Sequence, residues 1–398
     1  MDTIVRDAGA IGKKLYSMIE QQQTILISGY YGFGNTGDEA VLAAMISDLQ
    51  SACPGVDICV ISGDPAETQK QHQVKAVPID DLQTMVSEVK RSDLAIIGGG
   101  GLFHDYWGVD LSAILTDQHH GLALYSSLAL LTGLLNKPLM IYGVGVGPLQ
   151  TEQGKQITRA VFETARTATV RDHESKVVLC DLGLDPDKIT VTADPSFRWL
   201  ARNHHSPVSP QISAPEPYLG IALRNWNLGP ASHAWEGQVA DAVDDYLELY
   251  EGSVVFIPFQ VGEDRLSNDL EIANRIHRQL RNRERAVVLN PDLSPGAISS
   301  VISACDVLLG MRLHSIIFAA LNEVPVVGLG YDPKIFRTMR QLGIEEYALP
   351  LEQLNRQVLL ARLEKAVRNA PGFREQLGEQ KEGWKTRAWV NTHEAGRI

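Results

Sequence analysis

The stretch that decides the fold is Val307 to Lys334, VLLGMRLHSIIFAALNEVPVVGLGYDPK. It contains two short apolar segments, Val307 to Gly310 and Pro325 to Gly330, which are bounded by Gly or Pro and are too short for typical helices. We therefore predict two buried strands, with a crossover helix over Ser315 to Asn322 between them. A strand, helix and strand in this order place the two strands parallel to each other.

Charged side chains follow both of these predicted strands. Arg312 and His314 come just after the first strand, and Lys334 comes just after the second. Ligands of open α/β sheets bind outside the carboxyl ends of the strands, so we expect these three residues to share a site. Two cations indicate an anionic ligand, and an imidazole can transfer a proton near neutral pH.

Apolar segments alternate with amphipathic segments along most of the chain. In the first half, the predicted strands are Thr24 to Gly29, Val56 to Ser62, Leu94 to Gly98, Pro138 to Val144, Thr167 to Val170 and Ile189 to Ala193. In the second half, they are Tyr218 to Leu223, Val254 to Pro258, Ala286 to Leu289 and the two strands described above. This alternation predicts an α/β fold with two Rossmann-like domains, each built on a parallel sheet with helices on both faces.

A proline-rich stretch with few apolar residues separates the two halves of the chain. We predict an N-terminal domain over residues 1–202, a linker over 203–217, a C-terminal domain over 218–370 and a helical tail over 371–398. The chain has 398 residues, of which 44% are hydrophobic, so it can bury two cores. An amphipathic tail of this kind can pack back across the first domain.

Composition excludes several classes of protein. The formal net charge of -12 argues against a general nucleic-acid binder. The four cysteines are scattered without a close pair, so we expect no metal site and no disulfide framework. Residues 1–20 lack the apolar centre of a signal peptide, which indicates a cytoplasmic protein. The nearly uncharged stretch Gly121 to Asn136 falls short of the roughly 20 residues that span a bilayer and is predicted to be a buried helix.

The first predicted strand leads into a glycine-rich turn in which Gly32, Gly34 and Gly37 match the pattern GxGxxG. Glycines permit a tight turn, and the start of the following helix can bind an anion. Taken alone, the pattern indicates a dinucleotide site. However, Asp38 and Glu39 place negative charge where a pyrophosphate would bind. A purely structural turn is the other interpretation.

Two further strand ends carry polar residues with open interpretations. The run Gly98 to Gly101 follows a predicted strand, and its bare backbone is predicted to form a wall of the cleft. His104 and Asp105 after it are either an acid/base pair or a helix cap. Asp194 precedes Pro195 and either starts a turn or orients a cation or a sugar hydroxyl.

The guanidinium of Arg171 follows another strand of the first half. It either faces Arg312 and Lys334 across the cleft, where it can bind a carboxylate or phosphate, or it pairs with Asp172, Glu174 or Asp194. Gln260 follows a strand of the second half, and its amide can reach a hydroxylated acceptor.

The motifs YGFGNTGDE, IIGGGGLF, YGVGVGPL, VRD, ADPSF, MRLHS and YDPK occur in this order between Thr24 and Gly343. Together they resemble the polysaccharide pyruvyltransferase family, specifically its CsaB-type bacterial branch. The resemblance implies a GT-B-like arrangement of the two domains. It also implies transfer of pyruvyl from phosphoenolpyruvate to a sugar, with formation of a pyruvate ketal and release of phosphate. The acceptor implied for this branch is N-acetylmannosamine in a lipid-linked precursor of a cell-wall polysaccharide.

By matching the motifs VRD, RLHS and DPK, the resemblance places catalytic roles on Arg171, His314 and Lys334. The substrate-binding residues are predicted to be Arg312, Leu313, Asn35, Gly99, Gly100, Asp194 and Gln260. Phosphoenolpyruvate carries a carboxylate and a phosphate on adjacent atoms, so a cluster of Arg and Lys suits it. Whether His314 or Lys334 handles the proton stays open at this point.

Phosphoenolpyruvate is a substrate, so no cofactor is expected. The expected partners are a lipid-linked saccharide and, peripherally, the inner face of the membrane. The segment Asp105 to Leu122 is longer than the family pattern and is expected to reshape the acceptor side. Three alternatives are a GT-B glycosyltransferase using a nucleotide sugar, an NAD-dependent oxidoreductase that rests on GxGxxG alone, and a non-catalytic sensor. A sensor would not need the proton-handling His314.

Overall fold

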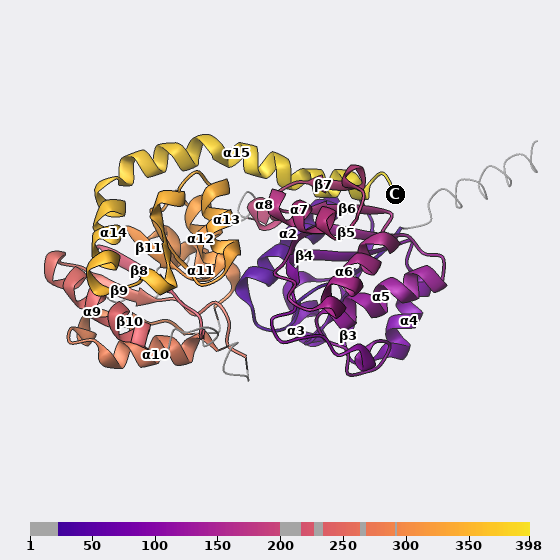
Figure 1. The fold of residues 1–398 in the computed structure, drawn as a ribbon, viewed down its shortest axis with the longest axis horizontal. Coiled ribbons are helices and arrows are strands. Elements are labelled where there is room, and N and C mark those ends of the chain that lie inside the picture. Colours follow the sequence, from indigo (N-terminus) through magenta and orange to yellow (C-terminus); the bar gives the residue numbers. More distant parts are fainter. Residues whose placement is uncertain (1–22, 200–215, 227–233, 263–267, 291–292) are drawn as a thin grey trace, which may run out of the picture.

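The computed structural model describes residues 23–199, 216–226, 234–262, 268–290 and 293–398. These residues form two sheets that lie side by side (Figure 1). The first sheet has the strand order β3-β2-β1-β4-β5-β6-β7, and the second has the order β10-β9-β8-β11-β12-β13. Neighbouring strands are parallel in both sheets. The predicted fold class, two Rossmann-like domains in a GT-B-like arrangement with a helical C-terminal segment, is confirmed.

The first sheet contains all six strands predicted for this half and one more. Its strands are β1 Thr24–Ser28, β2 Asp57–Ser62, β3 Lys75–Pro78, β4 Leu94–Phe103, β5 Leu139–Val146, β6 Thr167–Val170 and β7 Ile189–Val191. Its helices are α2 Thr36–Ala52, α3 Pro65–His72, α4 Leu82–Arg91, α5 Leu122–Leu134, α6 Glu152–Thr164, α7 His173–Asp181 and α8 Ser196–Trp199. Strand β3 was not predicted because its four residues begin with Lys and end with Pro, which leaves too short an apolar signal.

The second sheet likewise contains every predicted strand of its half. Its strands are β8 Tyr218–Ala222, β9 Ser253–Phe256, β10 Ala286–Val288, β11 Val307–Gly310, β12 Val326–Gly330 and β13 Ala348–Pro350. Its helices are α9 Ala234–Leu249, α10 Asp269–Gln279, α11 Pro295–Ser303, α12 Leu313–Leu321 and α13 Pro333–Gln341. The crossover helix α12 begins two residues earlier than predicted, so His314 lies in its first turn. The unpredicted strand β13 has only three residues.

One prediction about the first sheet was wrong. The run Gly98 to Gly101 does not follow a strand but lies inside β4, because Leu102 and Phe103 continue the pairing with β5 beyond it. The register shifts between Gly100 and Phe103, and Gly99 and Gly100 have positive φ values of 64° and 79°. The glycines therefore form an irregularity that β4 accommodates without ending.

The carboxyl ends of the two sheets face each other. The strand order reverses between β1 and β4 in the first sheet and between β8 and β11 in the second, which is where open α/β sheets bind ligands. The start of α2 meets the loop after β9, because the amide of Thr36 donates to the carbonyl of Phe259 at 2.8 Å. The two switch points thus enclose one space between the sheets.

The last two helices, α14 Arg356–Arg368 and α15 Ala370–Ala395, link the two halves. Figure 1 shows α15 running along both of them. Its first turns pack on the second half, where the rings of Phe373 and Tyr347 lie 4.4 Å apart. Its last turns reach the first sheet, where Thr392 is hydrogen-bonded to Tyr142 at 2.6 Å. Residues 203–215 of the predicted linker lie outside the described residues, and the predicted domain limits stay predictions.

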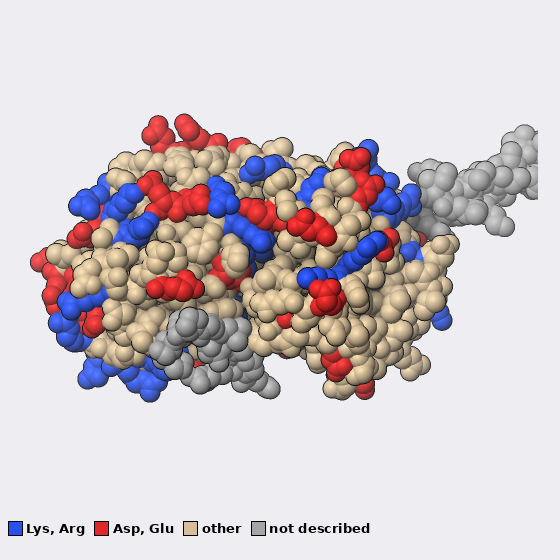
Figure 2. All heavy atoms as spheres, viewed as in Figure 1, with Lys and Arg blue, Asp and Glu red and all other residues tan. Residues whose placement is uncertain are grey.

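The face of the molecule drawn in Figure 2 shows acidic and basic side chains close together over both halves. Within the ranges given above, no helix combines the length and apolar character that a membrane crossing requires. The nearly uncharged stretch Gly121 to Asn136 contains helix α5, whose 13 residues are mostly buried in the first half.

Candidate active site

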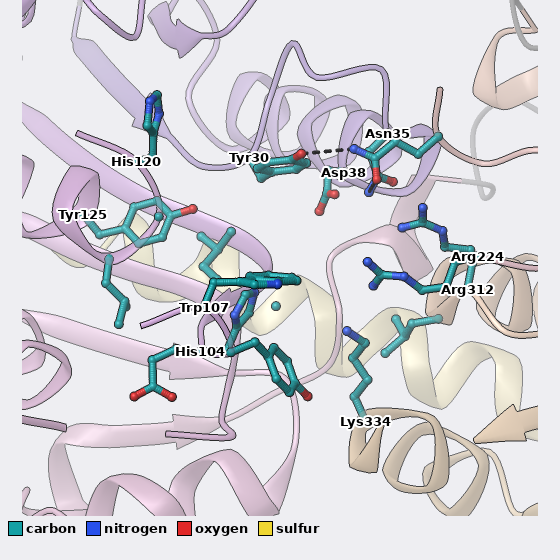
Figure 3. A pocket seen from close by; sticks show the side chains of 18 of the residues that line it. Tyr30, Asn35, Asp38, His104, Trp107, His120, Tyr125, Arg224, Arg312 and Lys334 are labelled. Atoms are coloured by element: carbon teal, nitrogen blue, oxygen red, sulfur yellow. Dashed lines mark hydrogen bonds between the residues drawn. The ribbon is translucent and has the colours of Figure 1, made fainter. Parts of the chain in front are cut away.

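A cavity of about 580 Å³ lies between the carboxyl ends of the two sheets (Figure 3). Both halves of the chain contribute to its wall, which is typical of ligand sites between domains. Of the predicted site residues, seven line the cavity: Arg171, Arg312, Leu313, His314, Lys334, Asn35 and Gln260. The further lining residues with polar or aromatic side chains are Tyr30, Asp38, His104, Asp105, Tyr106, Trp107, Asp110, His120, Tyr125, Arg224, Phe259 and Tyr331.

Arg312 is held rigidly at the start of α12. Its Nη2 lies 2.6 Å from Oδ1 of Asp269, and its Nε lies 2.9 Å from Oδ2. Asp269 also accepts hydrogen bonds from the backbone amides of Phe259 and Gln260, each at 3.1 Å. The bidentate pair fixes the guanidinium and balances much of its charge.

Arg171 adopts both of the arrangements that the sequence left open. Its Nη1 lies 2.9 Å from Oδ2 of Asp194, and the side chain also lines the cavity. Gly145 of β5 makes room for it, since a Cβ atom there would lie 2.6 Å from Nε of Arg171. The YGVGVGPL motif thus permits a buried guanidinium to reach the cavity from the first half.

Lys334 lies in the first turn of α13, and its ammonium is 3.2 Å from Oδ2 of Asp332. The hydroxyl of Tyr106 donates to the same carboxylate. The ammonium also lies 5.4 Å from the ring centroid of Tyr331. Burial alone would raise the pKa of Tyr331, but the nearby cations, first Arg224 and then Lys334, outweigh burial and lower that pKa.

Arg224, after β8, was not among the predicted substrate-binding residues. It stacks on Trp226 and Tyr331, with its Cζ atom 5.4 and 5.3 Å from the two ring centroids, and donates to the Tyr331 hydroxyl at 3.1 Å. Among the described residues, no carboxylate lies within ion-pair distance of it, and its buried Nε has no hydrogen-bond partner. Its charge is therefore directed at the cavity without a carboxylate partner.

His314 packs against the start of helix α2. A Cβ atom on Gly37 would lie 2.0 Å from Nδ1 of His314, so the last glycine of the GxGxxG match is needed for the two halves to meet. Nε2 of His314 is buried, has no hydrogen-bond partner among the described residues, and lies 3.7 Å from Oδ2 of Asp194. Burial would raise the pKa of Asp194, but His314 and Arg171 outweigh burial and lower it.

Asp38 is the second residue of the site that can exchange a proton. Its side chain lines the cavity, and the residue is only 8% exposed. Burial, with a further contribution from the charge of Glu39, raises its pKa to about 6 although His314 opposes the shift. Sequence reasoning treated Asp38 only as a helix-dipole charge. Its burial follows from the packing of α2 between the two sheets, for which the sequence carries no local signal.

Three predicted residues lie behind the cavity wall. Gly99 packs against Val41 and Gly100 against Asp38, since added Cβ atoms would lie 2.0 and 2.7 Å from those side chains. Asp194 is only 2% exposed and contacts the cavity through Arg171. From this glycine run, it is Gly101 that lines the cavity.

Asn35 and Gln260 join the two halves at the cavity edge. Asn35 caps α2 by accepting from the amide of Gly37 at 3.0 Å, and its side-chain amide donates to Gln260 at 3.4 Å. Gln260 in turn donates to the hydroxyl of Tyr30 at 3.1 Å. These contacts leave both residues on the cavity wall, while giving each of them a structural role as well.

The segment after β4 forms the wall opposite the cations. Figure 3 shows Trp107 and His104 facing Arg224 and Lys334 across the cavity. Burial, followed by the charge of Lys334, lowers the pKa of His104 to about 4, so its ring is neutral at neutral pH. Asp105 is neither an acid/base partner of His104 nor a cap of the next helix. It accepts from the amides of Gln150 and Thr151, at 2.6 and 2.7 Å, and so fixes the loop before α6.

The arrangement can bind an anion and move protons. Four cations reach one cavity, three of them held by carboxylates, and two groups that can exchange a proton lie beside them. Over the described part of the chain, no group of three or more His, Cys, Asp or Glu side chains is arranged to hold a metal ion.

The fold and this interdomain site define a GT-B-like protein with a cationic cavity. Known structures with the same fold include a UDP-N-acetylglucosamine 2-epimerase from Listeria monocytogenes, described as putative, with a TM-score of 0.63, 16% identity and coverage of 92% of this chain and 94% of the other. A glycosyltransferase from Rickettsia africae aligns with a TM-score of 0.60 and 11% identity, over 95% of this chain and 98% of the other. At these identities, the likeness shows the fold alone.

Sequence comparison identifies the family. The profile of the polysaccharide pyruvyl transferase family matches residues 35–333, so the chain belongs to that family of enzymes. The amylovoran biosynthesis protein AmsJ of Erwinia amylovora is 24% identical over 394 residues, covering 89% of this chain and 94% of AmsJ. The resemblance that the motifs indicated is therefore confirmed at the level of the family.

Proposed function

We propose that this enzyme transfers the pyruvyl group of phosphoenolpyruvate to two hydroxyl groups of one sugar, forming a pyruvate ketal and releasing phosphate. One observation supports the donor most directly. Arg171 from the first half converges with Arg224, Arg312 and Lys334 from the second half on one cavity. Phosphoenolpyruvate needs such a set because it carries a carboxylate and a phosphate on adjacent atoms.

The surroundings of each cation indicate whether it binds the carboxylate or the phosphate of the donor. Arg312 and Arg171 are held by Asp269 and Asp194 and provide fixed donors in known positions. Arg224 has no carboxylate partner among the described residues, so it can neutralise ligand charge most effectively. We assign it to the phosphate, whose charge grows as the bond to carbon breaks.

His314 is assigned as the base that activates a sugar hydroxyl. Its Nε2 is buried, has no hydrogen-bond partner in the part of the chain that the structure describes, and lies near Asp194, which stabilises a positive imidazolium. Lys334 is paired with Asp332 and is assigned to charge binding.

The acceptor is assigned to the aromatic wall formed by the segment Asp105 to Leu122. Trp107 is 57% exposed, although it lines the cavity, so one ring face is available to a sugar. The CsaB-type resemblance favours N-acetylmannosamine of a lipid-linked cell-wall precursor, brought to the inner membrane face. AmsJ is an amylovoran biosynthesis protein, so a saccharide of amylovoran is the second class of acceptor to test.

A glycosyltransferase that uses a nucleotide sugar is the competing function, because the glycosyltransferase from Rickettsia africae shares the fold. Family membership favours pyruvyl transfer. The cavity also contains more cationic side chains than a nucleotide diphosphate requires, and it includes the proton-handling His314.

The test is a phosphorus NMR time course of the purified protein with phosphoenolpyruvate. Inorganic phosphate should appear only when a synthetic acceptor is added, from a panel that includes N-acetylmannosaminides and saccharides of amylovoran. His314→Gln should keep donor affinity but lose about 10²- to 10⁴-fold in kcat, whereas His277→Gln, remote from the cavity, serves as the matched control. No turnover across the panel, together with tight binding of a UDP-sugar, would contradict the proposal.

A further inference from the structure

One carboxylate of the cavity differs from all the others. Asp194, Asp269 and Asp332 each accept several hydrogen bonds and each pair with a cation. Asp38 is comparably buried, at 8% exposure, yet no hydrogen bond or ion pair to its carboxylate is present among the described residues. Figure 3 shows this carboxylate pointing into the space between the two halves.

An unpartnered buried carboxylate is costly, and the cost is smaller when the group carries a proton. The pKa of Asp38 is correspondingly raised to about 6, mainly by burial. Gly100 approaches it so closely that a Cβ atom would lie 2.7 Å from Oδ1, so any larger residue there would collide with the carboxyl. A group of this kind in a cavity is typical of a proton donor in catalysis.

We propose that Asp38 is the acid that protonates the methylene carbon of the donor. The inference rests on the proposed function, since only a donor with a carbon–carbon double bond needs such a proton. It resolves the question that the sequence left open between His314 and Lys334 by assigning carbon protonation to neither of them.

The protons balance if Asp38 and His314 work in turn. Asp38 transfers its proton to the methylene carbon, which becomes a methyl group, while the first sugar hydroxyl bonds to C2 and gives its proton to His314. The bond from C2 to the phosphate oxygen then breaks, and His314 returns its proton to the departing phosphate. The second hydroxyl bonds to C2 and gives its proton to the Asp38 carboxylate. Both residues end in their starting states.

The charge of the donor supports a sequence of steps in which Asp38 begins as the protonated acid. A neutral carboxyl does not repel an incoming carboxylate and phosphate, and the bound anion makes the Asp38 proton harder to lose. Lys334 is less suited because its ammonium is paired with Asp332. His314 lies beside Asp194, which favours its role as a base.

The proposal predicts how turnover depends on pH. The groups that influence Asp38 are His314 and Arg171, which favour the carboxylate, Glu39 and Asp194, which favour the acid, and the neighbouring phenols of Tyr31 and Tyr125. Because the protonated form is the active one, kcat should fall as pH rises through the pKa of Asp38 in the donor complex. That pKa should lie at or above about 6, since the bound anion raises it.

The experiment compares Asp38→Asn with the wild-type protein and with Glu39→Gln. Glu39 is the next carboxylate of the same helical turn, but it accepts from Gly32 and pairs with His72 outside the cavity. Because its charge favours the acid form of Asp38, Glu39→Gln should move the fall of kcat to lower pH without abolishing turnover. Donor affinity is measured by calorimetry with phosphoenolpyruvate, and kcat is measured from phosphate release across pH 5 to 9. We expect Asp38→Asn to lose at least about 100-fold in kcat while binding the donor equally well or more tightly, since a repelling charge is gone.

Three results would overturn the proposal. These are full turnover by Asp38→Asn, a parallel loss of donor binding and turnover, and a wild-type kcat that does not fall at high pH. The last measurement applies even if the variant does not fold. If the wild-type protein itself does not use phosphoenolpyruvate with any acceptor, the proposed function is contradicted. That outcome is distinct from a failure confined to Asp38→Asn.

Discussion

At the scale of single residues, Asp38 should lower the stability of the protein at neutral pH. Its pKa rises from 3.8 to about 6 on folding, so the folded state binds a proton more tightly than the unfolded chain does. The stability of the folded state therefore falls as pH rises from about 4 to 6, and the full penalty, about 3 kcal/mol, is present above that range.

Asp38→Asn removes this penalty while keeping the shape of the side chain. We expect urea unfolding to show that the variant gains stability over the wild type between pH 4 and pH 6 and keeps the gain at pH 7, less what the buried amide loses. Glu39→Gln should not show this pH-dependent gain, because Glu39 has Gly32 and His72 as partners. An Asp38→Asn protein that is less stable than the wild type at pH 7 would show that the carboxylate is satisfied in the folded state.

Arg224 should bind the donor through its guanidinium, which has no carboxylate within ion-pair distance among the described residues. We expect Arg224→Met to weaken phosphoenolpyruvate binding by about 10- to 100-fold, the loss typical of a hydrogen bond to a charged group. The thioether side chain keeps much of the packing between Trp226 and Tyr331. Calorimetric titration measures the effect, and Arg278→Met on the exposed face of α10 is the control. Equal donor affinity in the two variants would exclude Arg224 from the donor site.

Residue types at strand ends were predictable, whereas their ion pairs were predictable only in part. Arg171, Arg312 and Lys334 stand out in the sequence because each follows an apolar strand. Asp194 was one of the partners considered for Arg171, and the structure contains that pair. The partner of Arg312 could not be identified, since Asp269 lies 43 residues away and meets it only in the folded domain. The prominence of Arg224 likewise depends on the lack of a carboxylate within ion-pair distance of it among the described residues, which no sequence pattern expresses.

At the scale of elements, the segment Asp105 to Leu122 should control acceptor binding. The ring of Trp107 is positioned by edge contacts with His104 and Tyr106, at centroid distances of 5.8 and 5.7 Å. We expect Trp107→Ala to raise the KM of the acceptor about 3- to 10-fold, the equivalent of one aromatic contact. Neither kcat nor donor affinity should change by more than about 2-fold, because Trp107 makes none of the donor contacts assigned above.

Steady-state kinetics with varied acceptor concentration measure this effect. Leu134→Ala is the control, since Leu134 is an apolar side chain on α5 that is 77% exposed and lies away from the cavity. A Trp107→Ala variant with unchanged acceptor KM would place the sugar elsewhere in the cavity.

The elements show which signals in the sequence are reliable. Strands such as β6 and β11 were predicted with their observed limits because apolar β-branched and Leu residues end abruptly at a charged residue or at Gly. Strand β4 was predicted too short, because glycines usually end a strand and here do not. The short edge strands β3 and β13 have too few apolar residues to be recognised.

At the scale of the whole molecule, α15 should stabilise the site by tying its last turns to the first sheet. Asn391 is fully buried, accepts from the Thr192 hydroxyl at 2.7 Å and donates to the Ala193 carbonyl at 3.1 Å. Ala193 precedes Asp194, which holds Arg171. The C-terminal helix of the second half is thus connected to the anion site through three residues of the first half.

We expect Asn391→Ala to lower the free energy of unfolding by about 1 to 3 kcal/mol, because two buried polar groups lose their partner. The KM of phosphoenolpyruvate should rise at the same time, since the loop before Asp194 is less firmly held. Urea unfolding and donor kinetics measure the two effects. Thr386→Ala, at an exposed position of the same helix, is the control. If only stability changes, then α15 does not influence the site.

The sequence indicated that the C-terminal tail can pack back across the first domain, but it could not show which surfaces of the two halves meet. Helical periodicity shows that α15 has a covered face but not that the first sheet covers it. The contact of Gly37 with His314 depends in the same way on how the two halves of the chain pack against each other. Both features become visible only when the complete chain is arranged in space.

The central claim is that the pyruvyl carbon of phosphoenolpyruvate becomes a ketal on a sugar. Carbon NMR with phosphoenolpyruvate labelled at C2 tests it directly in the presence of protein and acceptor. We predict that the label moves into a single quaternary ketal carbon that bears a new methyl group and stays attached to the saccharide, with one phosphate released per ketal. A label that stays in phosphoenolpyruvate, or that appears as free pyruvate whether or not acceptor is present, would contradict the account.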